Sequence, residues 1–302
     1  MRKLKIGLLD VDGHNFPNIA LMKISAWHKQ QGDEVEWCFP MKHYDKVYMS
    51  KVFTFTPDFN TCINADEIIK GGTGYYYPDG GDPLTNGIEH IYPDYKLYNI
   101  KDTAYGFLTR GCPRGCEFCI VEKKEGLCSR KVADLSEFWR GQKEIKLLDP
   151  NLLACKGSEK LLKQLIDSKA WIDITQGFDI RLMTDERANL IKQLKIKMIH
   201  FAWDKEKDEK NIIEKLKQFK KITGFDHRKL GVYMLTNFDT SFDYDLYRVY
   251  KLRELGYDPY VMIYEKWKAP RKIRLLQRWV NNKIIFRSGS ANTFEEYNEK
   301  IG

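Results

Sequence analysis

The sequence predicts an α/β protein in two parts, a small strand–helix–strand domain and a longer region of six strand–helix repeats. Two observations predict this class. Apolar strand patterns alternate with amphipathic helical patterns along most of the 302 residues. Several strands are also apolar almost throughout, which is typical of parallel sheets covered by helices. We therefore expect parallel sheets in both parts.

The first domain is expected over residues 1–100. A buried strand is predicted at 3–10 and a helix at 19–30, followed by strands at 34–39, 46–55 and 67–70. A loop separates the first strand from the helix. This order of strand, loop, helix and strand is that of a Rossmann-like open sheet.

The second domain is expected over residues 104–290, and residues 291–302 form a C-terminal tail. Its strands are predicted at 105–109, 145–149, 171–175, 198–202, 232–236 and 260–264. Its helices are predicted at 135–142, 158–168, 185–195, 209–222, 243–255 and 271–281. Six such units suit a partial (β/α)6 TIM-like barrel, whose functional residues lie at the carboxyl ends of the strands.

A cysteine motif begins where the first of these strands ends. Cys112, Cys116 and Cys119 have the spacing C-x3-C-x2-C. Thiolates are soft ligands that suit an iron–sulfur cluster. A [4Fe-4S] cubane has four irons, so three cysteines leave one iron open to a substrate or cofactor. Gly111 and Gly115 allow the loop to turn tightly around the cysteines.

This motif and its surroundings resemble the radical S-adenosylmethionine (SAM) superfamily. The resemblance implies that the open iron binds SAM and that an electron from the cluster cleaves it to a 5′-deoxyadenosyl radical, which abstracts a hydrogen atom. It also implies an electron donor of the flavodoxin or ferredoxin type. Phe118, just before the third cysteine, stands where the superfamily places an aromatic residue beside the adenine. The substrate stays open, a nucleic acid or nucleotide included.

Polar residues at the predicted strand ends are candidates for binding SAM or substrate. Arg181 is the candidate for an anion such as the SAM carboxylate, because a guanidinium binds a carboxylate through two hydrogen bonds. Gln176, Asp179 and Asn237 are candidates for SAM hydroxyl groups or substrate. The alternative is that many such residues are turn residues and helix caps.

The loop after the first strand contains Asp12-x-His14. It resembles the D-x-H-x-x-G loop of cobalamin-binding domains, where the histidine ligates cobalt and the aspartate fixes its tautomer. Pro17 stands where that motif has glycine, and proline does not easily replace glycine beside a flat cofactor. We therefore expect a degenerate domain of this kind, with Asp12 and His14 either retaining cobalamin or lining an active-site loop.

The other cysteines leave alternatives open. A structural zinc loop would need a fourth ligand, for which Cys128 is the nearby cysteine. Some radical SAM enzymes carry a second cluster, but the first domain has two cysteines, Cys38 and Cys62, rather than three. All four remaining cysteines, Cys155 included, are expected to be buried and inert. The alternative is that Cys128 or Cys155, near the predicted barrel mouth, has a thiyl or ligand role.

Two alternatives to a radical SAM enzyme that abstracts a hydrogen atom therefore stay open. One is a methylthiotransferase- or methyltransferase-like enzyme acting on RNA; we expect no RNA-binding β-barrel after residue 293, which counts against it. The other is a non-catalytic, metal-stapled protein that binds nucleic acid. The net charge of +8, from 50 Lys and Arg against 42 Asp and Glu, allows an anionic partner without requiring one.

The sequence favours the cytoplasm. Residues 1–6 have no long apolar segment or cleavage site, so we expect no signal peptide. No stretch approaches the ~20 apolar residues of a membrane span. Seven cysteines, three of them needed in reduced form, suit a reducing compartment.

Overall fold

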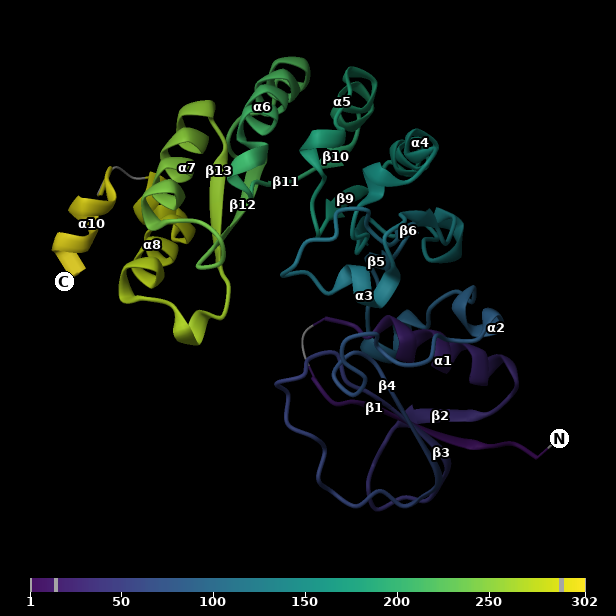
Figure 1. Ribbon diagram of the computed structural model, residues 1–302. Coiled ribbons are helices and arrows are strands. Elements are labelled where there is room, and N and C mark those ends of the chain that lie inside the picture. Colours follow the sequence, from purple (N-terminus) through teal and green to yellow (C-terminus); the bar gives the residue numbers. More distant parts are fainter. Residues whose placement is uncertain (1, 14–15, 288–290, 302) are drawn as a thin grey trace. The chain divides into compact units, whose positions relative to one another are not determined.

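The computed structural model describes residues 2–13, 16–287 and 291–301. The chain forms two compact units, Met1–Lys146 and Leu147–Gly302, which are described separately (Figure 1). Each contains strands in parallel pairs together with helices, so the predicted α/β class is confirmed. The domain boundary expected between residues 100 and 104 stays a prediction.

The first unit begins with a four-stranded parallel sheet. Its strands are β1 (Lys5–Asp10), β2 (Glu34–Trp37), β3 (Tyr44–Ser50) and β4 (Ala65–Gly71), in the order β2-β1-β3-β4. The chain places β2 on one side of β1 and β3 on the other, so the direction in which strands are added to the sheet reverses between β1 and β3. The loops that follow β1 and β3 therefore lie next to each other at the carboxyl edge of the sheet, where ligands bind in many open α/β sheets.

Helix α1 (Ile19–Gln30) follows β1, as the sequence predicts. Asn18 starts the helix, and its side chain accepts a hydrogen bond from the Leu21 amide at 3.2 Å. Leu21 and Ile24 pack against Ile6 and Leu8 of β1. This apolar contact, rather than a strong intrinsic helix propensity, holds the helix on the sheet.

The remainder of the first unit consists of short elements. These are α2 (Asn86–Glu89), the 3₁₀ turn η1 (Tyr95–Tyr98), β5 (Thr103–Gly106), β6 (Thr109–Arg110), α3 (Val121–Glu125), β7 (Arg130–Lys131), the 3₁₀ turn η2 (Leu135–Glu137) and β8 (Glu144–Leu147). Strand β8 runs across the boundary between the units. The predicted strand at 105–109 is thus divided into β5 and β6.

The helix predicted at 135–142 is wrong, because only η2 forms there. Asp134 and Glu137 form a capping box that begins the turn. Gly141 then adopts φ +94°, outside the helical region, and the Trp139 indole donates a hydrogen bond to the carbonyl of Gln142 at 2.8 Å. The polar groups that would continue a helix are used in this turn instead.

The second unit alternates strands and helices. Its strands are β9 (Trp171–Ile174), β10 (Lys195–Ile196), β11 (Ile199–Ala202), β12 (Leu230–Thr236) and β13 (Asp258–Ile263). Its helices are α4 (Ser158–Ser168), α5 (Asp185–Lys192), α6 (Glu209–Thr223), α7 (Phe242–Leu255), α8 (Arg271–Asn281), α9 (Lys283–Arg287) and α10 (Phe294–Ile301). Its 3₁₀ turns are η3 (Leu152–Ala154), η4 (Ile180–Leu182), η5 (Glu206–Asp208) and η6 (Lys266–Lys268).

Strands β11, β12 and β13 form a parallel sheet, and β9 pairs with β10 in parallel. Helices lie along one side of these strands, with α7 and α8 against β13 (Figure 1). Phe201 of β11 packs edge-on against Phe219 of α6 and near Tyr257, so the core of this unit lies between sheet and helices. Each predicted barrel strand overlaps an observed one, while closure into a partial (β/α)6 barrel stays a prediction.

Within the described ranges, no helix is both long enough and apolar enough to cross a membrane.

Candidate functional site

The cysteine motif lies in a loop between two paired strands. β6 and β7 are antiparallel, with Thr109 opposite Lys131 and Arg110 opposite Arg130. The chain between them carries the three cysteines and then α3. The Cys112 amide donates a hydrogen bond to the carbonyl of Gly126 at 3.1 Å. The strand pair and this bond close the base of the loop.

Glu125, the last residue of α3, fixes the start of the motif. Its carboxylate accepts hydrogen bonds from the Gly111 amide and from the Arg110 guanidinium, both at 3.0 Å. The Glu125 side chain is only 8% exposed, so these bonds are shielded from water. Its backbone carbonyl also accepts a hydrogen bond from Arg130 at 2.8 Å. Sequence analysis missed Glu125, because nothing in the spacing distinguishes it from the surface charges around it.

Gly111 is required by its surroundings. Its φ of +88° suits glycine, and a Cβ added there would lie 2.2 Å from the carbonyl oxygen of Cys128. Gly126 has a similar φ of +87°, but a Cβ there would meet nothing within 4 Å. Both glycines permit the turn, whereas Gly111 also permits the close approach of two backbone segments.

Cys112, Cys116 and Cys119 are half-buried and form no disulfide. In the part of the chain that the structure describes, no group of three or more His, Cys, Asp and Glu side chains is arranged to hold a single metal ion. In a [4Fe-4S] cluster each cysteine ligates a different iron, so the three sulfurs need not converge on one point. The thiol set in one loop therefore fits such a cluster chemically, and its role as ligand stays a prediction.

The other cysteines differ in environment. Cys155 is buried, as expected. The expected burial is wrong for Cys62 and Cys128, which are exposed, and for Cys38, which is half-buried. Burial raises the pKa of the Cys38 thiol, and the nearby Glu36 carboxylate adds to the effect. Cys38 is therefore mostly protonated near neutral pH, which does not favour a ligand role.

The structure brings Asp179 and Arg181 together at the carboxyl end of β9. Asp179 accepts hydrogen bonds from the Arg181 amide at 3.2 Å and from its guanidinium at 2.8 Å. The guanidinium also pairs with Asp208. Arg181 is thus already held by two carboxylates, so the anion contact predicted for it would have to replace one of them.

The remaining predicted SAM residues lie in different settings. Gln176 is exposed in the loop after β9, and Phe118 is half-buried beside the third cysteine. Asn237 has φ +62° and donates a hydrogen bond to the Tyr264 carbonyl at 2.8 Å, which joins the ends of β12 and β13. A turn role thus accounts for Asn237, and contact with SAM stays a prediction for all of these residues.

A buried arginine at the same strand ends was missed from the sequence. Arg248 of α7 is fully buried and donates hydrogen bonds to the carbonyls of Trp203 and Leu235, which follow β11 and end β12. It pairs with Asp245, which is also fully buried. Burial raises the pKa of Asp245 against the opposing effects of Thr240 and this pairing. An arginine beside the apolar Val249 could have suggested an inward side chain.

His200 of β11 lies on the opposite face of the strand from Phe201, which packs against α6. Its imidazole stacks on Tyr233, with ring centroids 4.5 Å apart and an angle of 8° between the planes. A Cβ on Gly231 would lie 2.7 Å from the ring, so glycine makes room for it. Burial, and to a smaller extent the charge of Lys283, lowers the pKa of His200 to about 4. His200 is therefore neutral at pH 7.

The loop after β1 is tied to the loop after β3. The Asp12 carboxylate accepts hydrogen bonds from the amides of Val52 and Phe53 and from the Thr56 hydroxyl. This explains why the predicted strand at 46–55 ends at Ser50. His14 lies outside the described residues, so the histidine part of the cobalamin prediction is not observed.

Gly72, the residue that follows β4, has a structural reason to be glycine. A Cβ on Gly72, which has φ +95°, would lie 2.4 Å from the carbonyl oxygen of Lys51. Glycine is therefore needed there for the backbone to approach Lys51, with or without a flat cofactor. Cobalamin binding stays a prediction.

The fold and this loop define an α/β protein with a three-cysteine loop closed by a strand pair. Comparisons with known proteins add one partial similarity. No protein-family model matches the chain. It is 30% identical over 122 residues to the CDK5RAP1-like protein of Oryza sativa subsp. japonica, a match that covers 36% of this chain and 20% of that protein. The match thus spans about a fifth of the length of that relative.

Proposed function

We propose that this chain is a radical SAM enzyme in which Cys112, Cys116 and Cys119 hold one [4Fe-4S] cluster. The observation that carries the proposal is the loop itself. Three cysteines at C-x3-C-x2-C spacing follow a short strand, and the base of their loop is closed by β7 and Glu125. A soft donor set of this kind suits iron–sulfur chemistry.

The cluster, when bound, supplies the electron that cleaves SAM to a 5′-deoxyadenosyl radical, which abstracts a hydrogen atom from the substrate. The protein's own residues position the thiols. Gly111 lets the chain pass the Cys128 backbone, and Glu125 fixes the Gly111 amide one residue before the first cysteine. Phe118 is the proposed neighbour of the adenine, and Gln176, Asp179, Arg181 and Asn237 are the proposed polar contacts to SAM.

Two alternatives remain open. The partial similarity to the CDK5RAP1-like protein is consistent with an enzyme of this superfamily and keeps the methylthiotransferase-like alternative open. A zinc-stapled protein that binds nucleic acid is the alternative from another class. Zinc would require a fourth ligand near the three cysteines, for which the exposed Cys128 is the candidate.

Anaerobic purification, cluster reconstitution and an assay for 5′-deoxyadenosine test the proposal. We expect about four irons per chain and reductive cleavage of SAM by the wild type. Cys116→Ala should abolish cleavage, whereas Cys128→Ala, in the same loop but outside the motif, should retain it. Zinc in place of iron, or an iron-loaded wild type that leaves SAM intact, would contradict the proposal. About eight irons per chain would instead indicate a second cluster.

A further inference from the structure

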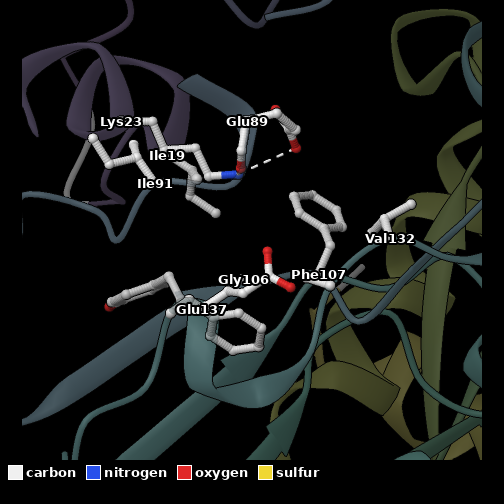
Figure 2. Close-up of a pocket in the computed structure, with 11 residues that line it drawn as sticks. Ile19, Lys23, Glu89, Ile91, Gly106, Phe107, Val132 and Glu137 are labelled. Atoms are coloured by element: carbon white, nitrogen blue, oxygen red, sulfur yellow. Dashed lines mark hydrogen bonds and ion pairs between the residues drawn. The ribbon is translucent and has the colours of Figure 1, made fainter. Parts of the chain in front are cut away.

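The first unit contains a cavity of about 650 Å³. Its walls come from α1, from the turn at residues 79–84 and from the base of the cysteine loop. None of the three motif cysteines lines it. Its volume is in the range of small-molecule sites. A second, much smaller cavity shares Ile19, Lys23, Glu89 and Val132 with it (Figure 2).

Three of the cations that line the large cavity already have carboxylate partners, and one of these is Lys131, which pairs with Asp134 at 2.7 Å. Lys23 pairs with Glu89 at 3.1 Å, as the dashed line in Figure 2 shows, and Arg110 pairs with Glu125 at 3.0 Å. Burial lowers the pKa of Lys23 against the opposing charge of Glu89. These pairs form part of the wall, and each is electrically neutral when both partners are ionised.

Two other cations that line the cavity form no ion pair with a carboxylate in the described part of the chain, although the Glu125 charge raises the pKa of Lys124 against the larger, lowering effect of burial. Among the residues that the structure describes, Arg130 bonds only to the backbone carbonyl of Glu125. Arg130 also lies directly opposite Arg110 in the β6–β7 pair. Like charges at opposite positions destabilise a strand pair, and the Glu125 carboxylate bonds to the guanidinium of Arg110, whereas Arg130 contacts the Glu125 backbone carbonyl. An anion beside Arg130 would relieve this repulsion.

The second cation without an ion pair in the described part of the chain is Lys124 of α3. Its ammonium donates no hydrogen bond to any residue that the structure describes. Its stem lies over Gly80, where an added Cβ would be 3.3 Å from Lys124 Cε. Gly81 has φ +77°, and a Cβ there would lie 2.6 Å from the Tyr76 ring. Gly80 therefore leaves room for the Lys124 side chain, and Gly81 leaves room for the Tyr76 ring.

The same cavity is lined by two exposed carboxylates, Asp79 and Asp82, with no ion-pair partner in the described ranges. They lie in the turn at residues 79–84, which also contains Gly80, over which the Lys124 stem lies. An anion in the cavity would meet attraction from Lys124 and Arg130 and repulsion from these carboxylates. Removing one of these carboxylates should then increase the affinity for an anion. An increase of this kind distinguishes an electrostatic site from nonspecific binding.

We propose that this cavity binds the phosphate group of a phosphorylated ligand, with Lys124 and Arg130 as its cationic contacts. A guanidinium matches phosphate oxygens through paired hydrogen bonds, and a lysine ammonium adds a compact charge. The phosphate can belong to a small phosphorylated molecule or to the backbone of an RNA strand. The inference does not depend on the proposed cluster chemistry, because the cavity is lined without the cysteines.

Calorimetric titration of the full chain with inorganic pyrophosphate and with a short single-stranded oligoribonucleotide tests the proposal. We expect saturable binding of at least one probe that weakens as salt increases. Lys124→Ala and Arg130→Ala should each weaken it about tenfold, the size of one charged hydrogen bond. Lys123→Ala is the matched control, since Lys123 is exposed on the same helix and does not line the cavity. Asp82→Asn should strengthen binding.

The two probes separate the sources of the phosphate. Pyrophosphate binding that the oligoribonucleotide does not displace indicates a small ligand, and displacement indicates RNA; both support a phosphate site. Binding of neither probe would overturn the proposal. An equal effect of Lys123→Ala and Lys124→Ala, or weaker binding by Asp82→Asn, would also overturn it. These measurements need no SAM, so their failure is distinct from a failure of the proposed enzyme activity.

Discussion

Glu125 offers the most direct test of how the cysteine loop is held. Its carboxylate accepts hydrogen bonds from the Gly111 amide and from Arg110, both at 3.0 Å, and is 8% exposed. Glu125→Ala removes both bonds. The Gly111 amide is then left unpaired in a buried position, whereas Arg110, whose side chain is 27% exposed, can regain water.

The expected cost follows from these two bonds. A hydrogen bond to a charged group contributes about 1.5–3 kcal/mol, and a buried amide left unpaired costs about 1–3 kcal/mol. Rehydration of Arg110 offsets part of the loss. We therefore expect Glu125→Ala to lower the free energy of unfolding by about 2–4 kcal/mol. Glu122→Ala, at an exposed position of the same helix, should change it by less than about 0.5 kcal/mol.

Urea unfolding of the metal-free protein and iron content after anaerobic reconstitution measure the two consequences. Glu125→Ala should lose stability and bind less iron, because the first cysteine is no longer fixed. Glu125→Gln should lie between it and the wild type, since the amide oxygen can still accept one of the two bonds. A Glu125→Ala protein with wild-type stability and a full iron complement would refute this account of the loop.

Three further predictions concern other contacts. Gly111→Ala should bind much less iron than Gly126→Ala, because both acquire an unfavourable positive φ but only the first meets a backbone oxygen, at 2.2 Å; equal iron contents would contradict this. The pKa of His200 is about 4 in the folded protein, against an ordinary value of 6.5. The folded state is therefore fully stable with respect to this group above pH 6.5, and it loses stability as the pH falls from 6.5 toward 4, because the unfolded chain then binds the proton more readily. His200→Phe should therefore remove up to about 3 kcal/mol of acid destabilisation, seen as a flatter dependence of the urea midpoint on pH. Arg248→Ala leaves the fully buried Asp245 without its partner and should cost about 3–5 kcal/mol in urea unfolding, and a smaller loss would show that the pair is dispensable.

Much of the fold could be predicted, because helices with a clear apolar period had few alternatives. α1, α4 and α8 have the predicted bounds. The failure at 135–142 has a local cause: the glycine at 141 and the turn around Trp139 outweigh a short apolar pattern. Strand ends were harder to predict, because contacts from distant loops decide them, as Asp12 does for β3.

The cysteine site could be proposed from its spacing alone and stays a prediction, whereas the roles of other residues depend on contacts that the sequence does not show. Arg181 is a reasonable anion ligand by residue type, yet two carboxylates already hold it. The contacts of Glu125 with Arg110 and Gly111, and those of Arg248 with the Trp203 and Leu235 carbonyls, could not be found from the sequence, because each joins residues of separate elements. Such contacts have no pattern in the sequence until the fold places them together.

Glu125 also links the cysteine loop to the cavity, and this permits one combined prediction. Its carboxylate holds Gly111, and its backbone carbonyl holds Arg130, a proposed phosphate contact. Glu125→Ala keeps that carbonyl but loosens the helix end that carries it. It should therefore reduce both iron content and pyrophosphate affinity, whereas Lys124→Ala should reduce only the affinity and Cys116→Ala only the iron content. If Glu125→Ala affected just one of the two, the base of the loop would not be a shared support, and the two proposed sites would have to be held independently.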